Sequence, residues 1–383
     1  MNVLALCADP GIPLDSTKGA TIHLMELWQA LARQGDRVEG VAGWRGGKLP
    51  GPSVPGLSLR PVPSREGDSE AFLGRVREQA REALQSVRPD VVWERLALAS
   101  AVGCEIAEEA GVPLVVEVNA PLDEEAARYR GAKLADEERS TQLRLLSAAS
   151  LVYCVSEALV PYARSRGADP SVVRVLPNGV DTRAFSGKRL DEGGRVRVGY
   201  VGSFKPWHGV EVLIEAFRRA VGLGADLELV LVGDGPMRSE IETFVEQSGL
   251  LERVRFYGSR PHAEIPAILR GVAIAVAPAP GDVDYYFSPL KVYEYAAAGC
   301  AVVAPRAGQV AERFRDGEDA CLVAPGNARE LTTALVSLGF DPARRQRLGA
   351  RARQRARNEF DWSHVAGRLR EWTEPLVAGR AKA

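Results

Sequence analysis

The chain has 383 residues, more than one hydrophobic core usually organises, so two domains are expected. Its apolar share of 46% and charged share of 26% are typical of a soluble globular protein, and a net charge of -1 argues against nucleic acid as the main partner. Four His, five scattered Cys and no apolar run near ~20 residues argue against a His-rich metal site, a disulfide framework and a membrane span.

Short runs rich in Val and Leu alternate with longer amphipathic stretches in the first half, a pattern typical of a parallel sheet covered by helices on both faces. We expect strands at residues 3–8, 38–42, 57–62, 91–94, 114–118, 151–155 and 173–176. We expect helices at residues 19–34, 70–87, 98–110, 123–149 with a break near Gly131, and 157–166. These elements predict one doubly wound domain.

Residues 177–195 are polar and rich in turn formers, which indicates a hinge, and the alternation then restarts. We expect strands at residues 196–201, 227–232, 254–257, 274–277, 301–304 and 321–323. We expect helices at residues 210–221, 236–247, 262–269, 290–298, 328–338, 342–359 and 362–376. The predicted fold class is therefore α/β, with two facing Rossmann-like domains and a ligand cleft at the carboxyl ends of their strands.

The Arg-rich segment 344–357 has two interpretations. It can be a phosphate-binding patch, or it can be the solvated face of a terminal helix. We favour the solvated face, so the segment is not part of the predicted site.

Neither half carries the G-x-G-x-x-G pattern of a dinucleotide fold, and G-x-x-x-x-G-K-[ST] is absent as well. Three loops that lead into helices suit a phosphate instead: residues 203–209 with Lys205 and His208, residues 233–236, and residues 289–294 with Lys291. If these loops converge, backbone amides, helix N-termini and cationic side chains would neutralise a diphosphate without a metal.

Residues 282–301 combine an aromatic loop, a helix start at Ser288 and Pro289, Lys291 in the first turn, and a break at Gly299. The stretch can be an anion-binding corner or an ordinary packed corner. Glu294 lies one turn from Lys291, and a carboxylate is a natural acceptor for two ribose hydroxyls. The alternative for Glu294 is a solvated helix residue, which its apolar neighbours disfavour.

Four segments together resemble a known family. They are PNGVD at residues 177–181, GYVG at 199–202, VGDGP at 232–236 and SPLKVYEYAAAG at 288–299. In this order they are similar to the GT4-type retaining glycosyltransferases with the GT-B fold. The resemblance implies transfer of a sugar from a nucleotide-diphosphate donor, with retention of configuration and without a metal.

The resemblance also implies roles for domains and residues. Residues 1–182, with a C-terminal helix at about 362–380, would bind the acceptor, and residues 183–361 would bind the nucleotide sugar. Glu294 would hold the ribose, and Gly19 would let the backbone approach the diphosphate. The implied catalytic residues are Lys291, His208, Lys205 and Asn119. The implied donor-binding residues are Gly19, Gly202, Ser203, Ser259, Arg260, Tyr286, Phe287, Ser288, Pro289, Leu290 and Glu294.

The chain departs from the family pattern at three places. Tyr286 stands where the first Glu of the E-x7-E motif is expected, so Asp282, Asp284 or backbone amides would have to contact the donor sugar. Ser203 and His208 match the Arg and Lys that commonly grip the diphosphate. Asn119 stands where a His often lies, and it can bind a sugar hydroxyl but cannot act as a base.

We therefore expect a cytoplasmic retaining glycosyltransferase with a nucleotide-sugar co-substrate, UDP-linked by default, and no other cofactor. Two alternatives stay open: a GT-B-like epimerase or phosphorylase, and a non-catalytic nucleotide-sugar-binding protein. The sequence does not identify the acceptor, which can be a small molecule, a glycan or a lipid-linked molecule reached by peripheral membrane contact, or the oligomeric state.

Overall fold

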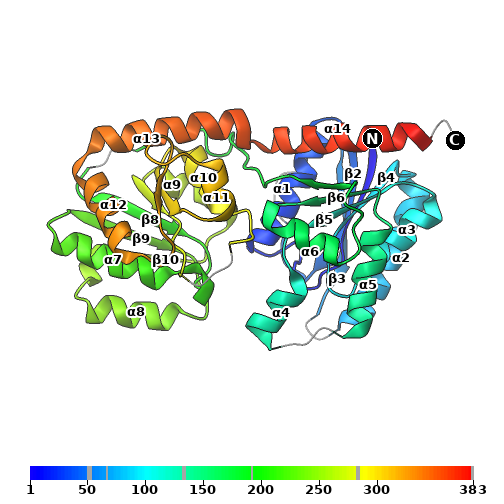
Figure 1. Ribbon diagram of the computed structural model, residues 1–383, viewed down its shortest axis with the longest axis horizontal. Coiled ribbons are helices and arrows are strands. Elements are labelled where there is room, and N and C mark those ends of the chain that lie inside the picture. Colours follow the sequence, from blue (N-terminus) through cyan, green and yellow to red (C-terminus); the bar gives the residue numbers. More distant parts are fainter. Residues whose placement is uncertain (50–53, 66–67, 132–134, 191–192, 282–284, 381–383) are drawn as a thin grey trace. The chain divides into compact units, whose positions relative to one another are not determined.

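The structure, a computed structural model, describes residues 1–49, 54–65, 68–131, 135–190, 193–281 and 285–380 (Figure 1). The chain divides into two compact units. The first contains residues 1–178, Tyr286–Ser288 and the helix that begins at Trp362. The second contains Gly179–Tyr285 and Pro289–Asp361.

The first unit is built on a seven-stranded parallel sheet in the order β3-β2-β1-β4-β5-β6-β7. Its strands are β1 (Asn2–Cys7), β2 (Arg37–Trp44), β3 (Leu57–Pro63), β4 (Val91–Arg95), β5 (Leu114–Val118), β6 (Leu151–Cys154) and β7 (Val173–Val175). Its helices are α1 (Gly19–Arg33), α2 (Ser69–Val87), α3 (Val102–Ala110), α4 (Leu122–Arg130), α5 (Asp136–Ser147), α6 (Val160–Ser165) and α14 (Trp362–Arg380). Helices cover the buried central strands, which explains why these strands read as continuous apolar runs.

The second unit repeats this plan with a six-stranded parallel sheet in the order β10-β9-β8-β11-β12-β13. Its strands are β8 (Val196–Val201), β9 (Leu227–Val232), β10 (Val254–Gly258), β11 (Ile274–Val276), β12 (Ala301–Pro305) and β13 (Cys321–Val323). Its helices are α7 (Val210–Gly222), α8 (Arg238–Gln247), α9 (Ile265–Leu269), α10 (Leu290–Ala298), α11 (Gly308–Arg313), α12 (Ala328–Phe340) and α13 (Pro342–Arg355). The predicted α/β class with two Rossmann-like sheets is confirmed.

The last helix, α14, belongs to the first unit and packs against α1 (Figure 1). The rings of His23 and Trp362 meet edge to face with centroids 5.3 Å apart. Arg370 Nη1 donates to the carbonyl oxygen of Gln34 at 2.6 Å. Helices α1 and α14 therefore pack together within the first unit, although they are far apart in the sequence.

Several predicted boundaries are wrong. Helix α3 begins at Val102 rather than at residue 98, α8 begins at Arg238, and α13 ends at Arg355, where a π-helical turn continues to Phe360. Helix α11 was not predicted, because six residues are too few for a helical period to be recognised. The interpretation of residues 344–357 as a solvated face is wrong for Arg345, which is buried.

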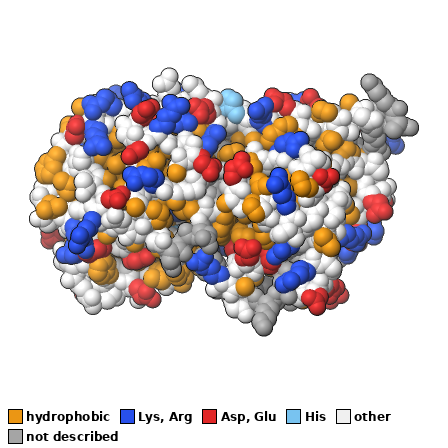
Figure 2. All heavy atoms as spheres, viewed as in Figure 1, with side chains coloured by type: hydrophobic (Ala, Val, Ile, Leu, Met, Phe, Trp, Pro, Cys, Tyr) orange, Lys and Arg blue, Asp and Glu red, His pale blue; other side chains and the backbone are white. Residues whose placement is uncertain are grey.

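Positive and negative side chains are interspersed over the face shown in Figure 2, in line with the net charge of -1. All five cysteines are free thiols, and four of them are buried. Within the described ranges, none of the helices combines the length and the apolarity that crossing a bilayer requires.

Candidate functional site

The loop after β8 leads to the N-terminus of α7 through two glycines with positive φ. At Gly202, where φ is +153°, a Cβ atom would lie 2.8 Å from Lys291 Nζ and 2.9 Å from Tyr200 Oη. At Gly209, φ is +65° and the residue caps α7, and a Cβ atom would lie 2.7 Å from the carbonyl carbon of Ala279. Side chains are excluded at both positions, so this loop presents backbone close to the side chain of Lys291.

The loop after β9 packs directly on this first loop. A Cβ atom on Gly233 would overlap the carbonyl oxygen of Gly202, and one on Gly235 would lie 2.7 Å from the carbonyl oxygen of Phe204. The amide of Phe204 donates to the carbonyl oxygen of Asp234 at 2.9 Å. Two of the three loops that the sequence analysis singled out are therefore joined at the carboxyl ends of neighbouring parallel strands.

Lys291 brings the third loop to the same place. It lies in the first turn of α10, with Nζ 3.4 Å from Tyr200 Oη and 4.7 Å from the centre of the Tyr200 ring. Within the described part of the chain, it forms no salt bridge. Burial lowers the pKa of Lys291 from 10.5 to about 8, and the nearby charge of Glu294 opposes this change. The side chain is thus a cation at neutral pH that an anion would stabilise.

His208 lies beside Lys291 but is not a second cation. Its Nδ1 lies 2.6 Å from the carbonyl oxygen of Ser203 and 3.2 Å from Tyr200 Oη. The contact with a carbonyl oxygen indicates that Nδ1 carries the proton. Burial first, and then the positive charges of Lys291 and Lys205, lower the pKa of His208 to about 3. At neutral pH the imidazole is therefore neutral, with its Nδ1 proton held by the Ser203 carbonyl oxygen and its Nε2 left as a hydrogen-bond acceptor.

Lys205 and Ser203 occupy the rim of the same loop. Lys205 Nζ lies 4.9 Å from the centre of the Trp207 ring, a cation–π contact. The carbonyl oxygen of Ser203 accepts from Tyr200 Oη at 2.8 Å as well as from His208. Ser203 therefore orients His208 through its backbone, whereas Lys205 stands at a half-buried position.

Glu294 follows Lys291 by one helical turn and is buried. Its Oε1 lies 2.7 Å from His262 Nε2. His262 stands in the short helical turn after β10, and its ring also meets Phe185 edge to face at 6.5 Å. His262 is not among the site residues predicted from the sequence, and only its position in the loop after a strand could have indicated a role.

Ser259 and Arg260 precede His262 and are exposed. Arg260 Nε donates to the carbonyl oxygen of Tyr257 at 2.9 Å, and its Nη1 lies 3.7 Å from Glu264 Oε2. The guanidinium is therefore engaged within its own loop.

Residues Tyr286–Ser288 belong to the first unit, and Tyr286 and Ser288 hydrogen-bond to other residues of it. Tyr286 Oη donates to a carboxylate oxygen of Glu125, and the carbonyl oxygen of Tyr286 accepts from Ser156 Oγ. Ser288 Oγ accepts from the amide of Asn178 at 3.0 Å, and its carbonyl oxygen accepts from Asn178 Nδ2 at 2.9 Å. The carboxylate expected at position 286 is absent, but Glu125 of α4 places one beside the Tyr286 hydroxyl. Sequence reasoning missed Glu125 because it lies about 160 residues away.

The segment continues from the aromatic pair into the start of α10. The Tyr286 and Phe287 rings meet at 90° with centroids 5.6 Å apart. Pro289 is the N-cap of α10, and Leu290 is its first residue. Asp282 and Asp284, the proposed substitutes for the missing carboxylate, lie outside the described residues.

The first unit has its own polar centre around Glu117, at the carboxyl end of β5. The side-chain amide of Asn119 donates to Glu117, His23 Nε2 lies 2.6 Å from Glu117 Oε1, and Tyr153 Oη donates to Glu117 Oε2 at 2.5 Å. Burial alone would raise the pKa of Glu117, but His23, Arg95 and Tyr153 together lower it to about 2. This fixed carboxylate accepts from the Asn119 amide group, which leaves the Asn119 carbonyl oxygen as the acceptor of that side chain.

Gly19 is the first residue of α1 and is exposed. It stands four residues before His23, so both lie on the same face of the helix. Among the described residues there is no group of three or more His, Cys, Asp or Glu side chains that could hold a metal ion.

Two phosphate-compatible loops, a half-buried lysine and a carboxylate lie at the strand ends of a Rossmann-like sheet, which is where α/β proteins of this class bind their ligands. The family described as "Glycosyltransferase Family 4" matches residues 17–184, and "Glycosyl transferases group 1" matches residues 195–341. The two matches span most of the chain, which belongs to the GT4-type glycosyltransferases with the GT-B fold.

Known proteins support this placement. The chain is 28% identical to a glycogen synthase of Mycobacterium tuberculosis over 289 residues, and this alignment covers 74% of this chain and 68% of that protein. In fold it is similar to a sucrose-phosphate synthase from Thermosynechococcus elongatus, with a TM-score of 0.80 and 21% identity over 99% of this chain and 100% of that one. It is also similar to the Anabaena protein HepE solved in complex with UDP-glucose, with a TM-score of 0.73 and 20% identity over 97% and 98% of the two chains.

Proposed function

We propose that this protein transfers a sugar from a nucleotide-diphosphate donor, UDP-linked by default, to an acceptor hydroxyl, with retention of configuration and without a metal. The observation that carries the proposal is the position of Lys291. Its ammonium lies against Gly202, in the first turn of α10, and burial holds its pKa at about 8. A diphosphate at this point would meet the positive ends of two helices and one cation.

The proposed reaction occurs on one face of the sugar. The bond between the anomeric carbon and the diphosphate oxygen breaks, the acceptor oxygen bonds to the same carbon, and the acceptor proton moves to the leaving diphosphate. The chain's contribution is to stabilise the charge that develops on the diphosphate. Lys291 supplies charge and Lys205 adds charge at the rim, whereas neutral His208, whose Nδ1 proton is held by the Ser203 carbonyl oxygen, supports the loop.

We assign donor binding to the second unit and acceptor binding to the first. Glu294 would hold the ribose, with its orientation set by His262. Asn119 would accept a sugar hydroxyl. The free, mostly buried thiols support a reducing, cytoplasmic location.

A nucleotide screen tests the proposal. Thermal unfolding with UDP, GDP, ADP and dTDP should show one nucleotide that stabilises the protein, by about 2.7 kcal/mol at one hundred times its dissociation constant. Replacing an exposed lysine outside the site, as in Lys188→Met, should leave the stabilisation by that nucleotide unchanged. No stabilisation by any of the four would contradict the proposal.

A turnover experiment separates the proposal from its alternatives. Release of the nucleoside diphosphate should occur at a high rate only when an acceptor from a glycan and lipid panel is added. Product formation without an acceptor would indicate an epimerase, phosphate dependence a phosphorylase, and tight binding without turnover a binding protein.

A further inference from the structure

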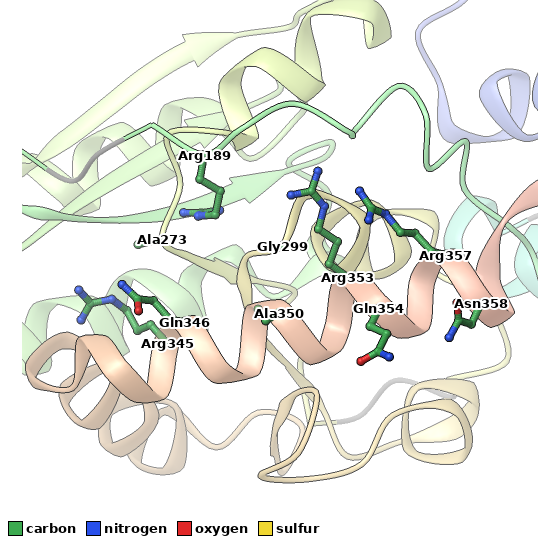
Figure 3. Close-up of a pocket in the computed structure, with 11 residues that line it drawn as sticks. Arg189, Ala273, Gly299, Arg345, Gln346, Ala350, Arg353, Gln354, Arg357 and Asn358 are labelled. Carbon is green, nitrogen blue, oxygen red and sulfur yellow. The ribbon is translucent and has the colours of Figure 1, made fainter.

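The second unit contains a cavity of about 480 Å³ away from the loops described above. Ala273 and Gly299, which line it, come just before β11 and β12, so the cavity lies at the amino ends of these strands (Figure 3). The strands are parallel, so Lys291 and the glycine loops lie at the opposite edge of the same sheet. A ligand here would not compete directly with the nucleotide sugar.

The lining of the cavity is strongly basic. Arg345, Arg353 and Arg357 come from α13 and the π-helical turn that follows it, and Arg189 comes from the segment that precedes β8. In Figure 3 the Arg189 side chain extends toward α13, and Arg353 extends from α13 toward that segment. Three side-chain amides of the same helical stretch add further hydrogen-bond donors. A π-helical turn is frequent at functional sites, and here it carries Arg357 to the cavity.

Carbonyl oxygens, rather than carboxylates, hold these arginines. Arg353 Nη2 donates to the carbonyl oxygen of Ser186 at 2.6 Å, and Arg189 Nη2 donates to that of Val272. Within the described ranges, no carboxylate forms a salt bridge with Arg189, Arg353 or Arg357. The guanidinium groups of Arg189 and Arg353 are therefore fixed in position, and no described carboxylate pairs with them or with the exposed Arg357.

Not every arginine of α13 lacks a carboxylate partner, as Arg355 shows. On another side of the same helix it pairs with Asp319 at 2.6 Å and with Glu359 at 3.0 Å. At the cavity, by contrast, burial and then the charges of Arg357 and Arg189 lower the pKa of Arg353. The arginines repel one another, so an anion between them would gain both direct hydrogen bonds and relief of this repulsion.

We infer that this cavity binds a multiply charged phosphate group. The guanidinium fork matches phosphate geometry, two fixed forks with Arg357 on the same lining favour a di- or trianion over a monovalent ion, and the volume suits a small molecule. The segment 344–357 thus combines the two interpretations that its sequence allowed, with one face solvated and the other lining an anion site. This inference does not depend on the proposed glycosyl transfer.

Titration calorimetry with sodium pyrophosphate at fixed chloride concentration tests the inference. The variants are Arg357→Gln at the cavity, the control Arg351→Gln at an exposed position of α13 outside it, and Lys291→Met, which removes the cation of the proposed donor site. We expect a pyrophosphate site that persists in Lys291→Met, is unchanged in Arg351→Gln, and is weakened about tenfold or more in Arg357→Gln through the loss of a charge-assisted contact.

A second arm identifies the source of the phosphate. Flotation with phosphatidic acid vesicles that depends on Arg357 assigns the site to a lipid headgroup, whereas pyrophosphate binding without flotation assigns it to a soluble phosphate. Thermal unfolding without anion should show Arg357→Gln to be at least as stable as the wild type, because one repulsive charge is removed. The inference is overturned if Arg357→Gln binds like the wild type, if Arg351→Gln loses binding equally, or if all binding disappears in Lys291→Met.

Discussion

Replacing Lys291 with methionine should lower activity and raise stability at the same time. Methionine keeps the apolar stem that packs near Tyr200 and removes only the charge. The reduction of the lysine pKa from 10.5 to about 8 corresponds to roughly 3 kcal/mol of destabilisation of the charged form, at about 1.4 kcal/mol for each pH unit. Because the folded-state pKa lies below the unfolded-state value, this destabilisation is fully present below pH 8 and disappears as the pH rises to 10.5.

Urea unfolding at pH 7 should therefore show Lys291→Met to be more stable than the wild type, by at most about 3 kcal/mol. The difference should vanish above pH 10.5. Turnover, measured as nucleoside diphosphate release with the nucleotide found in the screen, should fall by about 10²- to 10³-fold, the usual effect of removing one group that stabilises developing charge. Lys188→Met should change neither quantity.

The experiment is decisive because stability and turnover are expected to change in opposite directions. A purely structural lysine would destabilise the protein when it is replaced and would change turnover little. Near-normal turnover of Lys291→Met would refute the assignment of the diphosphate to this position. Unchanged stability with lost turnover would refute only the electrostatic argument.

Further outcomes are expected elsewhere in the chain. Glu294→Gln should weaken nucleotide binding about tenfold in calorimetry, since one charge-assisted hydrogen bond is lost, while Glu312→Gln on the exposed surface should bind normally. Gly202→Ala should weaken the same binding because its Cβ would displace the lysine ammonium, whereas Gly222→Ala, with open space around it, should not; equal affinities would contradict this. Burial raises the pKa of Glu94 from 4.5 to about 7, so wild-type stability should fall as the pH rises from 4.5 to 7, and Glu94→Gln should flatten this part of a stability–pH profile.

Most of the fold could be predicted because the central strands are covered on both faces. Every residue of β12 (Ala301–Pro305) is buried, so the strand reads as an apolar run that ends at proline. Glycine likewise marks the end of α10, where Gly299 takes the left-handed conformation with φ of +73°. Helix α11 has no such signal, because its six residues include a buried glutamine, Gln309, that accepts from Tyr293.

The candidate site was harder to predict because its chemistry depends on contacts through space. The loop positions of Lys291 and His208 were visible in the sequence, but the neutral state of His208 depends on burial and on the charge of Lys291. The pairing of Glu294 with His262, and the presence of Glu125 beside Tyr286, join residues distant in the chain. No local sequence pattern predicts such pairings.

The packing of α14 on α1 has a consequence for biosynthesis. About 330 residues, including the whole second unit, separate the end of α1 from the start of α14. At roughly 5 to 20 residues per second, a ribosome needs about 15 to 65 s to bridge this interval. During that time the nascent first unit lacks the helix that covers α1, so its folding can finish only after α14 has been synthesised. Loss of the C-terminal helix would therefore leave an apolar surface on the N-terminal half of the chain, exposed to chaperones and proteases.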